Sequence, residues 1–128
     1  MRLLLDTHTL IWWMTSDPHL SKVARAAIEH KGNIPLVSAV SAWEIATKGR
    51  LGRLPTATDL VQNFVAELQV HRIEILEMSA EHGIRAGLLP GPHQDPFDRM
   101  LIAQAQAEDM PIVSNDRALD GYGVHRIW

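Results

Sequence analysis

Short apolar runs alternate with stretches of helical periodicity along this chain. Runs such as LVS and PIVS are almost continuously apolar, which is typical of strands buried on both faces of a parallel sheet. The pattern predicts five strands, at residues 2–7, 34–39, 72–78, 110–115 and 123–128.

Helical patterns fill the intervals between these strands. We expect helices over residues 8–14, 20–31, 41–50, 57–70, 79–88 and 97–109, and a short one near 117–121. Strands that alternate with helices favour a layered α/β fold with a mainly parallel sheet. No repeat, low-complexity tract or linker interrupts the pattern, so residues 1–128 are expected to form a single domain.

Three helix starts carry capping signals. Ser41 and Glu44 have the form of a capping box, with serine at the N-cap and glutamate at the third helical position. TATD at 56–59 is a weaker version. In DPFDRMLIA, Asp95 precedes a proline and is expected to cap a helix, and Asp98 falls in its first turn.

Composition restricts the class of protein. A chain of 128 residues is long enough to bury one core. Cysteine is absent, which excludes disulfides and thiolate metal sites. No apolar run approaches the roughly 18 residues of a membrane span, and no secretory signal is visible. We therefore expect a soluble, cytoplasmic protein with no membrane partner.

The charge balance limits how the chain contacts nucleic acid. Its net charge is −3, whereas proteins that bind nucleic acid by bulk electrostatics are usually basic. Binding would need a local basic patch, metal ions or a partner surface. Lys48, Arg50 and Arg53 form the strongest local excess, in a segment without acids. A solvated helix end explains them equally well, because cations suit the last turn of a helix.

Four carboxylates follow the ends of predicted strands or open the helices beside them. In open parallel sheets, ligands bind outside the carboxyl ends of the strands. Asp6 ends the first strand, and Glu44 lies in the first turn after the second. Asp98 opens the helix before the fourth strand, and Asp116 follows that strand. We expect these four side chains to meet on one edge of the sheet.

Three of the four acids can be explained by a structural role alone, and Asp6 is the exception. The capping box accounts for Glu44, the helix dipole for Asp98, and a cap on the short helix for Asp116. Asp6 directly follows a buried strand, where an unpaired charge is costly, and no lysine or arginine is obviously assigned to it. A divalent cation would satisfy it.

The donor atoms indicate which metal and which reaction. All four candidates offer oxygen, which favours Mg²⁺ or Mn²⁺ over zinc. Such ions support phosphodiester hydrolysis. The seven histidines show no metal-binding spacing; His8 and His93 are candidates for substrate contact. Trp12, Trp13 and Trp43 are interpreted as core or interface residues.

Four segments, in this order, resemble the PIN-domain ribonucleases, and most closely the VapC-type toxins of toxin–antitoxin pairs. They are LLLDTHTLIW, VSAVSAWEIATKGRLGRL, DPFDRMLIAQA and PIVSND. The resemblance implies an α/β/α sandwich with a mainly parallel sheet of four to five strands. It matches the family's four acidic metal ligands, for Mg²⁺ or Mn²⁺, to Asp6, Glu44, Asp98 and Asp116.

The resemblance also implies partners and supporting residues. It implies an RNA substrate, a homodimer and inhibition by a VapB-like antitoxin. Thr7, Asp95 and Ser114 match residues that support the ligands. Our candidates for contact with RNA phosphates are Lys48, Arg50, Arg53, Arg99 and Arg117.

Two other functions agree less well with the sequence. A phosphoacceptor receiver domain needs a lysine after its last-but-one strand, but the lysines here are Lys22, Lys31 and Lys48. Such a domain also needs an aspartate after its middle strand, where this chain has Ser79. A non-catalytic binding module would not need all four acids. The four acids therefore favour metal-dependent hydrolysis of phosphodiester bonds, and the resemblance implies that the substrate is RNA.

Overall fold

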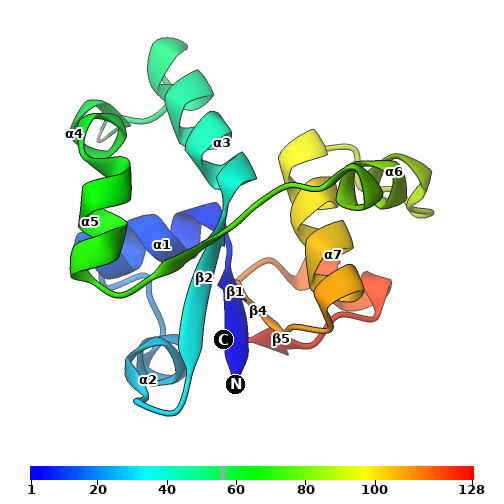
Figure 1. Ribbon diagram of the computed structural model, residues 1–128, viewed down its shortest axis with the longest axis horizontal. Helices are drawn as coiled ribbons and strands as arrows, with labels where there is room; N and C mark the ends of the chain where they lie inside the picture. The colour runs from blue at the N-terminus through cyan, green and yellow to red at the C-terminus, as the bar shows by residue number, and fades with distance from the viewer. Residues whose placement is uncertain (56) are drawn as a thin grey trace.

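The computed structural model describes residues 1–55 and 57–128 and contains one five-stranded sheet. All neighbouring strands are parallel, in the order β3-β2-β1-β4-β5 (Figure 1). This confirms the predicted parallel α/β sheet. The strands are β1 Arg2–Leu5, β2 Ile34–Ser38, β3 Glu74–Leu76, β4 Ile112–Val113 and β5 Arg126–Ile127.

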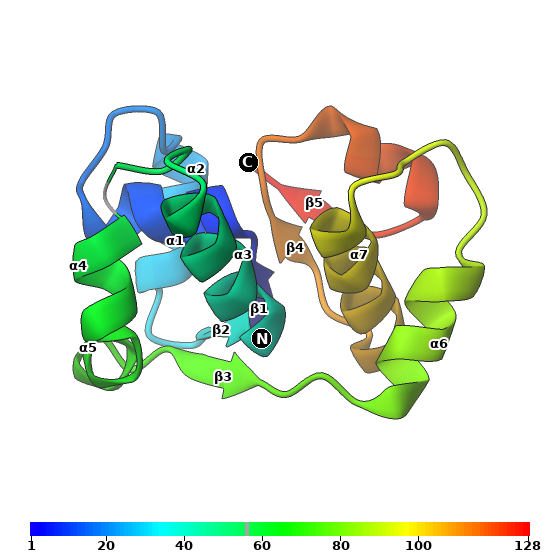
Figure 2. The same cartoon turned by 90° about the horizontal axis from the view of Figure 1, so that it is seen from above.

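Helices cover both faces of the sheet, so the three-layer sandwich is also confirmed. One side carries α1 Thr7–Met14, α2 Lys22–Glu29, α4 Ala57–Gln62 and α5 Phe64–Val70 (Figures 1 and 2). The helix α3 Ala39–Arg50 extends past the carboxyl end of β2 and contacts both α1 and α7. The other side carries α6 Ala80–Leu88, α7 Pro96–Glu108 and the 3₁₀ helix η1 Arg117–Tyr122. Within the described ranges, no helix has the length and apolarity needed to cross a membrane.

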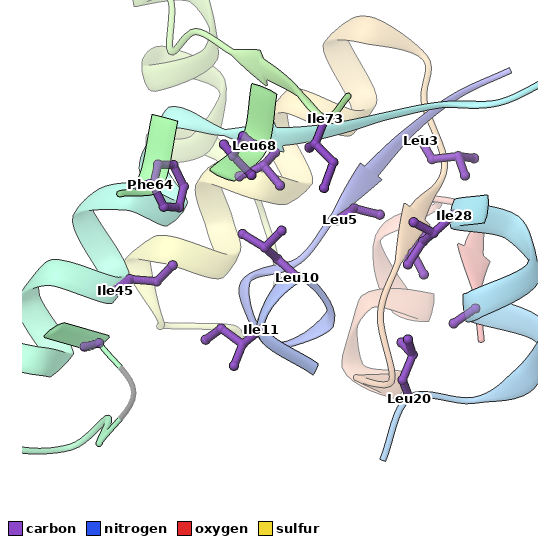
Figure 3. Packing of buried hydrophobic residues seen from close by; sticks show 14 residues of the cluster. Leu3, Leu5, Leu10, Ile11, Leu20, Ile28, Ile45, Phe64, Leu68 and Ile73 are labelled. Atoms are coloured by element: carbon purple, nitrogen blue, oxygen red, sulfur yellow. The ribbon is translucent and has the colours of Figure 1, made fainter. Parts of the chain in front are cut away.

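Alternating side chains of β1 divide the core in two. Leu3 and Leu5 face the cluster beneath α1, α2 and α5, which Figure 3 shows from close by. Leu4 faces the cluster beneath α7, where it joins Leu101 and Ile102. All three leucines of β1 are fully buried, and each contributes about 1.5–3 kcal/mol by burial. The central strand is therefore held from both sides.

The order of the strands creates a switch point beside β1. The chain runs from β1 outward to β2 and β3, then crosses the other face through α6 and α7 to reach β4. The neighbours β1 and β4 therefore lead into connections on opposite faces of the sheet. Such a point leaves a crevice outside the carboxyl ends of the two strands.

The predicted capping box at Ser41 is wrong. The helix begins two residues earlier than expected, at Ala39, and its cap is Ser38, whose hydroxyl accepts from the Val40 N–H at 3.0 Å. Serines at both positions can cap, but Ser38 ends a buried strand and turns the chain directly into the helix. Ser41 is fully buried inside α3, and Glu44 lies a turn beyond the capping position.

Other boundaries differ from the expected ones. The helix expected at 57–70 is two helices, because Asn63 has a φ of −123° and leaves the helical region. The helix expected at 20–31 is shorter, starting after its cap Ser21. The strands are also shorter than expected at β3, β4 and β5. Residue 56, where the weaker capping motif begins, lies outside the described residues.

Candidate functional site

Asp6 leaves the end of β1 and caps α1. One carboxylate oxygen accepts from the Thr9 N–H at 2.7 Å, and the Asp6 N–H donates to the Val113 carbonyl of β4 at 3.2 Å. Burial raises the pKa of Asp6, while hydrogen bonds from Ser114 and Thr9 oppose that rise. No lysine or arginine forms an ion pair with it within the described residues. The absence of a cationic partner agrees with the sequence analysis, which overlooked the cap.

Glu44 is a buried carboxylate that no cap explains. Its side chain is only 5% exposed. It accepts from the Thr7 hydroxyl at 2.6 Å and forms an ion pair with Lys48, one turn along α3. The Thr7 hydroxyl also lies 2.9 Å from that of Ser41. The Thr7 hydroxyl thus contacts the carboxylate of Glu44 and the hydroxyl of Ser41, a residue that was expected only as a cap.

Asp98 occupies the first turn of α7, as expected, and Asp95 is the cap. The Asp95 carboxylate accepts from the N–H groups of Phe97 at 2.9 Å and Asp98 at 3.2 Å. Burial raises the pKa of Asp98 to about 6, and the charges of Asp95, Glu44 and Asp116 add to the rise. The nearby ring of His93 acts in the opposite sense. Asp98 therefore lies in a field of negative charge that favours a cation.

Asp116 follows β4 and caps η1, which was one of its two predicted roles. Its carboxylate accepts from the Ala118 N–H at 3.0 Å. Its own N–H donates to the buried hydroxyl of Ser114 at 3.1 Å. Ser114 therefore fixes the turn that carries Asp116. Its hydroxyl also acts to lower the pKa of Asp6.

The four acids meet in one cleft of about 430 Å³ at the switch point. It is lined by Asp6, His8, Glu44, Lys48, Asp95, Asp98, Asn115, Asp116 and Arg117. Nothing in the sequence indicated that Asn115 would line the cleft, apart from its position directly after β4. The carboxylates supply oxygen donors only, and their mutual repulsion is relieved when a divalent cation binds. The residues present therefore fit Mg²⁺ or Mn²⁺.

The predicted RNA-contacting residues fall into two groups. Lys48 and Arg117 line the cleft, and Arg53 joins Lys48 in lining an adjoining hollow of about 220 Å³. Arg50 is exposed at the end of α3 and lines a different hollow. Arg99 lies away from both, in contact with backbone.

The Arg99 guanidinium is used inside the protein. It donates to the carbonyls of Ala86 at 2.9 Å, Leu89 at 2.5 Å and His93 at 2.8 Å. These contacts tie the end of α6 and the following loop to α7. The structure therefore gives Arg99 a scaffolding role, and its predicted contact with RNA gains no support.

Comparison with known proteins identifies relatives over nearly the whole chain. The model of the PIN domain matches residues 3–124, which include all four acids. Ribonuclease VapC22 of Mycobacterium tuberculosis is 30% identical over 117 residues, or 91% of this chain and 88% of that protein.

Solved structures agree with this fold. VapBC2 from Rickettsia felis, bound to a DNA fragment from its promoter, matches with a TM-score of 0.72 at 18% identity. That match covers 98% of this chain and 97% of the other. VapC20 of Mycobacterium tuberculosis, described as a sarcin–ricin loop cleaving toxin, matches with a TM-score of 0.68 at 12% identity, covering 95% of each chain.

Proposed function

The chain belongs to the PIN-domain family, as a VapC-type ribonuclease toxin of a VapBC system, and on that premise we propose that it cleaves RNA with Mg²⁺ or Mn²⁺. The metal ligands in this proposal are Asp6, Glu44, Asp98 and Asp116. One observation carries it: four acids from four distant segments line a single cleft at the switch point of the sheet.

The surroundings of the acids suit this role. When bound, a divalent cation acts as a Lewis acid that activates water and neutralises the charge of the phosphate. Two of the acids are held without any ion: the Thr9 N–H orients Asp6, and the Thr7 hydroxyl orients Glu44. Such preorganised ligands need little rearrangement to bind an ion.

Cations at the cleft account for how an acidic protein holds RNA. Lys48 and Arg117 line the cleft, and Arg53 extends the basic surface into the adjoining hollow. In the proposal these three side chains contact phosphates on either side of the bond that is cut. Arg50 remains a more distant candidate.

The proposed partners are a VapB-like antitoxin and a second copy of the chain. Similarity in fold to proteins solved as VapBC complexes supports an antitoxin partner. Expression of the intact chain is expected to arrest bacterial growth, and co-expression of the cognate antitoxin to restore it.

RNA cleavage by purified protein tests the proposed reaction. Cleavage should require Mg²⁺ or Mn²⁺ and stop when a chelator is added. Asp6→Asn and Asp98→Asn should each lower the rate by more than about 100-fold, the upper end of the loss when a residue that only supports a ligand is removed.

Asp59→Asn is the matched control, because this aspartate is exposed on α4 and does not line the cleft. It should cleave RNA at the rate of the unchanged chain. Cleavage that survives the chelator, or that survives both substitutions in the cleft, contradicts the metal mechanism.

A further inference from the structure

His93 lies in the loop between α6 and α7, with its ring nitrogen Nε2 beside two of the cleft carboxylates. Nε2 is 3.2 Å from Oδ2 of Asp98 and 3.6 Å from Oδ2 of Asp116. The nitrogen is shielded from solvent, and within the described residues it has no hydrogen-bond partner. One nitrogen of His93 and one carboxylate oxygen each of Asp98 and Asp116 thus lie close together, and the nitrogen forms no hydrogen bond to either oxygen.

The spacing of these atoms fits adjacent positions around one ion. An octahedral ion that binds its ligands at about 2.1 Å holds neighbouring ligand atoms about 3 Å apart. The two distances from Nε2 are slightly longer than this, and the three atoms all lie within 4.8 Å of one another. Small adjustments of the side chains bring all three into contact with a single ion.

An ion pair between a protonated His93 and the two acids is the competing explanation. The side chains of Asp98 and Asp116 are 31% and 42% exposed, and ion pairs to such partly exposed carboxylates contribute little to stability. Here neither contact of Nε2 has hydrogen-bond geometry. A shared ion satisfies the nitrogen and both carboxylates together, which the ion pair does not.

The loop is built to hold this ring in place. The His93 N–H donates to the hydroxyl of Tyr122 at 2.9 Å, and the His93 carbonyl accepts from Arg99 at 2.8 Å. Gly91 has a φ of +110°, and a side chain there would come within 2.8 Å of the Tyr122 hydroxyl. The scaffolding role of Arg99 is therefore, in part, to position His93.

We propose that Nε2 of His93 binds the same ion as Asp98 and Asp116, so that the site prefers Mn²⁺ to Mg²⁺. The proposal rests on the proposed function for the presence of an ion in the cleft. Imidazole nitrogen suits transition metals, whereas Mg²⁺ takes oxygen ligands. The four acids alone favour neither ion, so His93 supplies the discrimination.

Pulsed electron paramagnetic resonance of bound Mn²⁺ detects a nitrogen ligand directly. We expect coupling to ¹⁴N in the unchanged protein and its loss in His93→Gln, with His93→Asn as a second variant if the first does not fold. His8→Gln is the matched control, because His8 is a histidine that lines the cleft but does not belong to the group formed by His93, Asp98 and Asp116. That variant should keep the coupling.

Metal affinity provides a second measurement. His93→Gln should raise the Kd for Mn²⁺ by about 10- to 100-fold and leave the Kd for Mg²⁺ nearly unchanged. Circular dichroism of each variant shows that the fold is intact. An equal loss of affinity for both ions contradicts the proposed preference.

The outcomes separate this proposal from the proposed function. Absence of nitrogen coupling in the unchanged protein, or its persistence in folded His93→Gln, overturns the role of His93 even if RNA is cleaved. Nitrogen coupling without any metal-dependent RNA cleavage supports the role of His93 and contradicts the ribonuclease mechanism.

Discussion

The two sides of the cleft hold their acids in different ways. On the side of α1 and α3, Glu44 is buried, receives a hydroxyl donor and has Lys48 as a counter-ion. On the side of α7 and η1, the side chains of Asp98 and Asp116 are 31% and 42% exposed, and no lysine or arginine pairs with either within the described residues. Glu44 is thus neutralised by a lysine of the protein, whereas Asp98 and Asp116 keep their negative charge without a lysine or arginine partner.

Removal of the counter-ion should have the largest effect on stability. Lys48→Met leaves the carboxylate of Glu44 buried and without a cation, which costs about 3 kcal/mol, the lower end for breaking a buried pair because Lys48 is partly exposed. Urea unfolding in the presence of a chelator measures the loss.

Added Mn²⁺ should recover part of that stability, because the ion replaces the missing positive charge. Lys31→Met is the control, since Lys31 is exposed and distant in sequence from the cleft. A Lys48→Met protein as stable as the unchanged chain would show that Glu44 needs no counter-ion.

Loss of the hydroxyl donor should have a smaller effect on the same side. Thr7→Val keeps the shape of the side chain but removes the hydrogen bond to Glu44, a bond to a charged group worth about 1.5–3 kcal/mol. We expect a corresponding fall in the free energy of unfolding and slower RNA cleavage.

Thr7→Ser restores the hydroxyl and should restore most of both quantities. Equal losses in the valine and serine variants would assign the effect of Thr7 to packing alone.

On the side of α7 and η1, removal of a charged group should raise the free energy of unfolding instead of lowering it. The folded-state pKa of Asp98 is about 6, above its unfolded value of 3.8, so the folded protein binds a proton that the unfolded chain releases. This contribution to stability is complete below about pH 4 and is lost as the pH rises through 6. Asp98→Asn should therefore stabilise the metal-free protein above pH 6, by about 1 kcal/mol after allowing for solvent screening.

Unfolding of both proteins between pH 4 and 8, with a chelator present, measures this difference. The advantage of Asp98→Asn should disappear towards pH 4, because Asp98 is then protonated in the unchanged chain. A constant difference across this range would contradict the raised pKa of Asp98.

The positions of the acids could be predicted because they depend on chain order. Asp6 and Asp116 follow neighbouring parallel strands, and the switch-point rule places such residues together. The surroundings of Glu44 were harder to predict. Ser38 and Ser41 can both cap the helix, and Glu44 belongs to a capping box only if Ser41 is the cap. The packing of the strand before the helix decides for Ser38. The pairing of Glu44 with Lys48 was not predicted, although a spacing of four residues favours contact on a helix.

The role of Arg99 could not be predicted. Its acceptors are backbone carbonyls, which every residue carries, so no pattern of side chains marks them. The same holds for Tyr122, whose hydroxyl meets a backbone N–H 29 residues away. Contacts of this kind depend on the conformation of a loop. Proline and glycine in the sequence predict where a loop lies but not which conformation it adopts.

The cap on α1 has a consequence for how quickly an ion comes and goes. Because Oδ1 of Asp6 is held by the Thr9 N–H, the carboxylate keeps its direction whether or not an ion is present, and Oδ2 remains available. Helix formation thus completes this part of the site as the chain folds. If Asp6 binds Mg²⁺ as proposed, exchange of the ion is expected to be limited by the slow loss of its water rather than by movement of the protein.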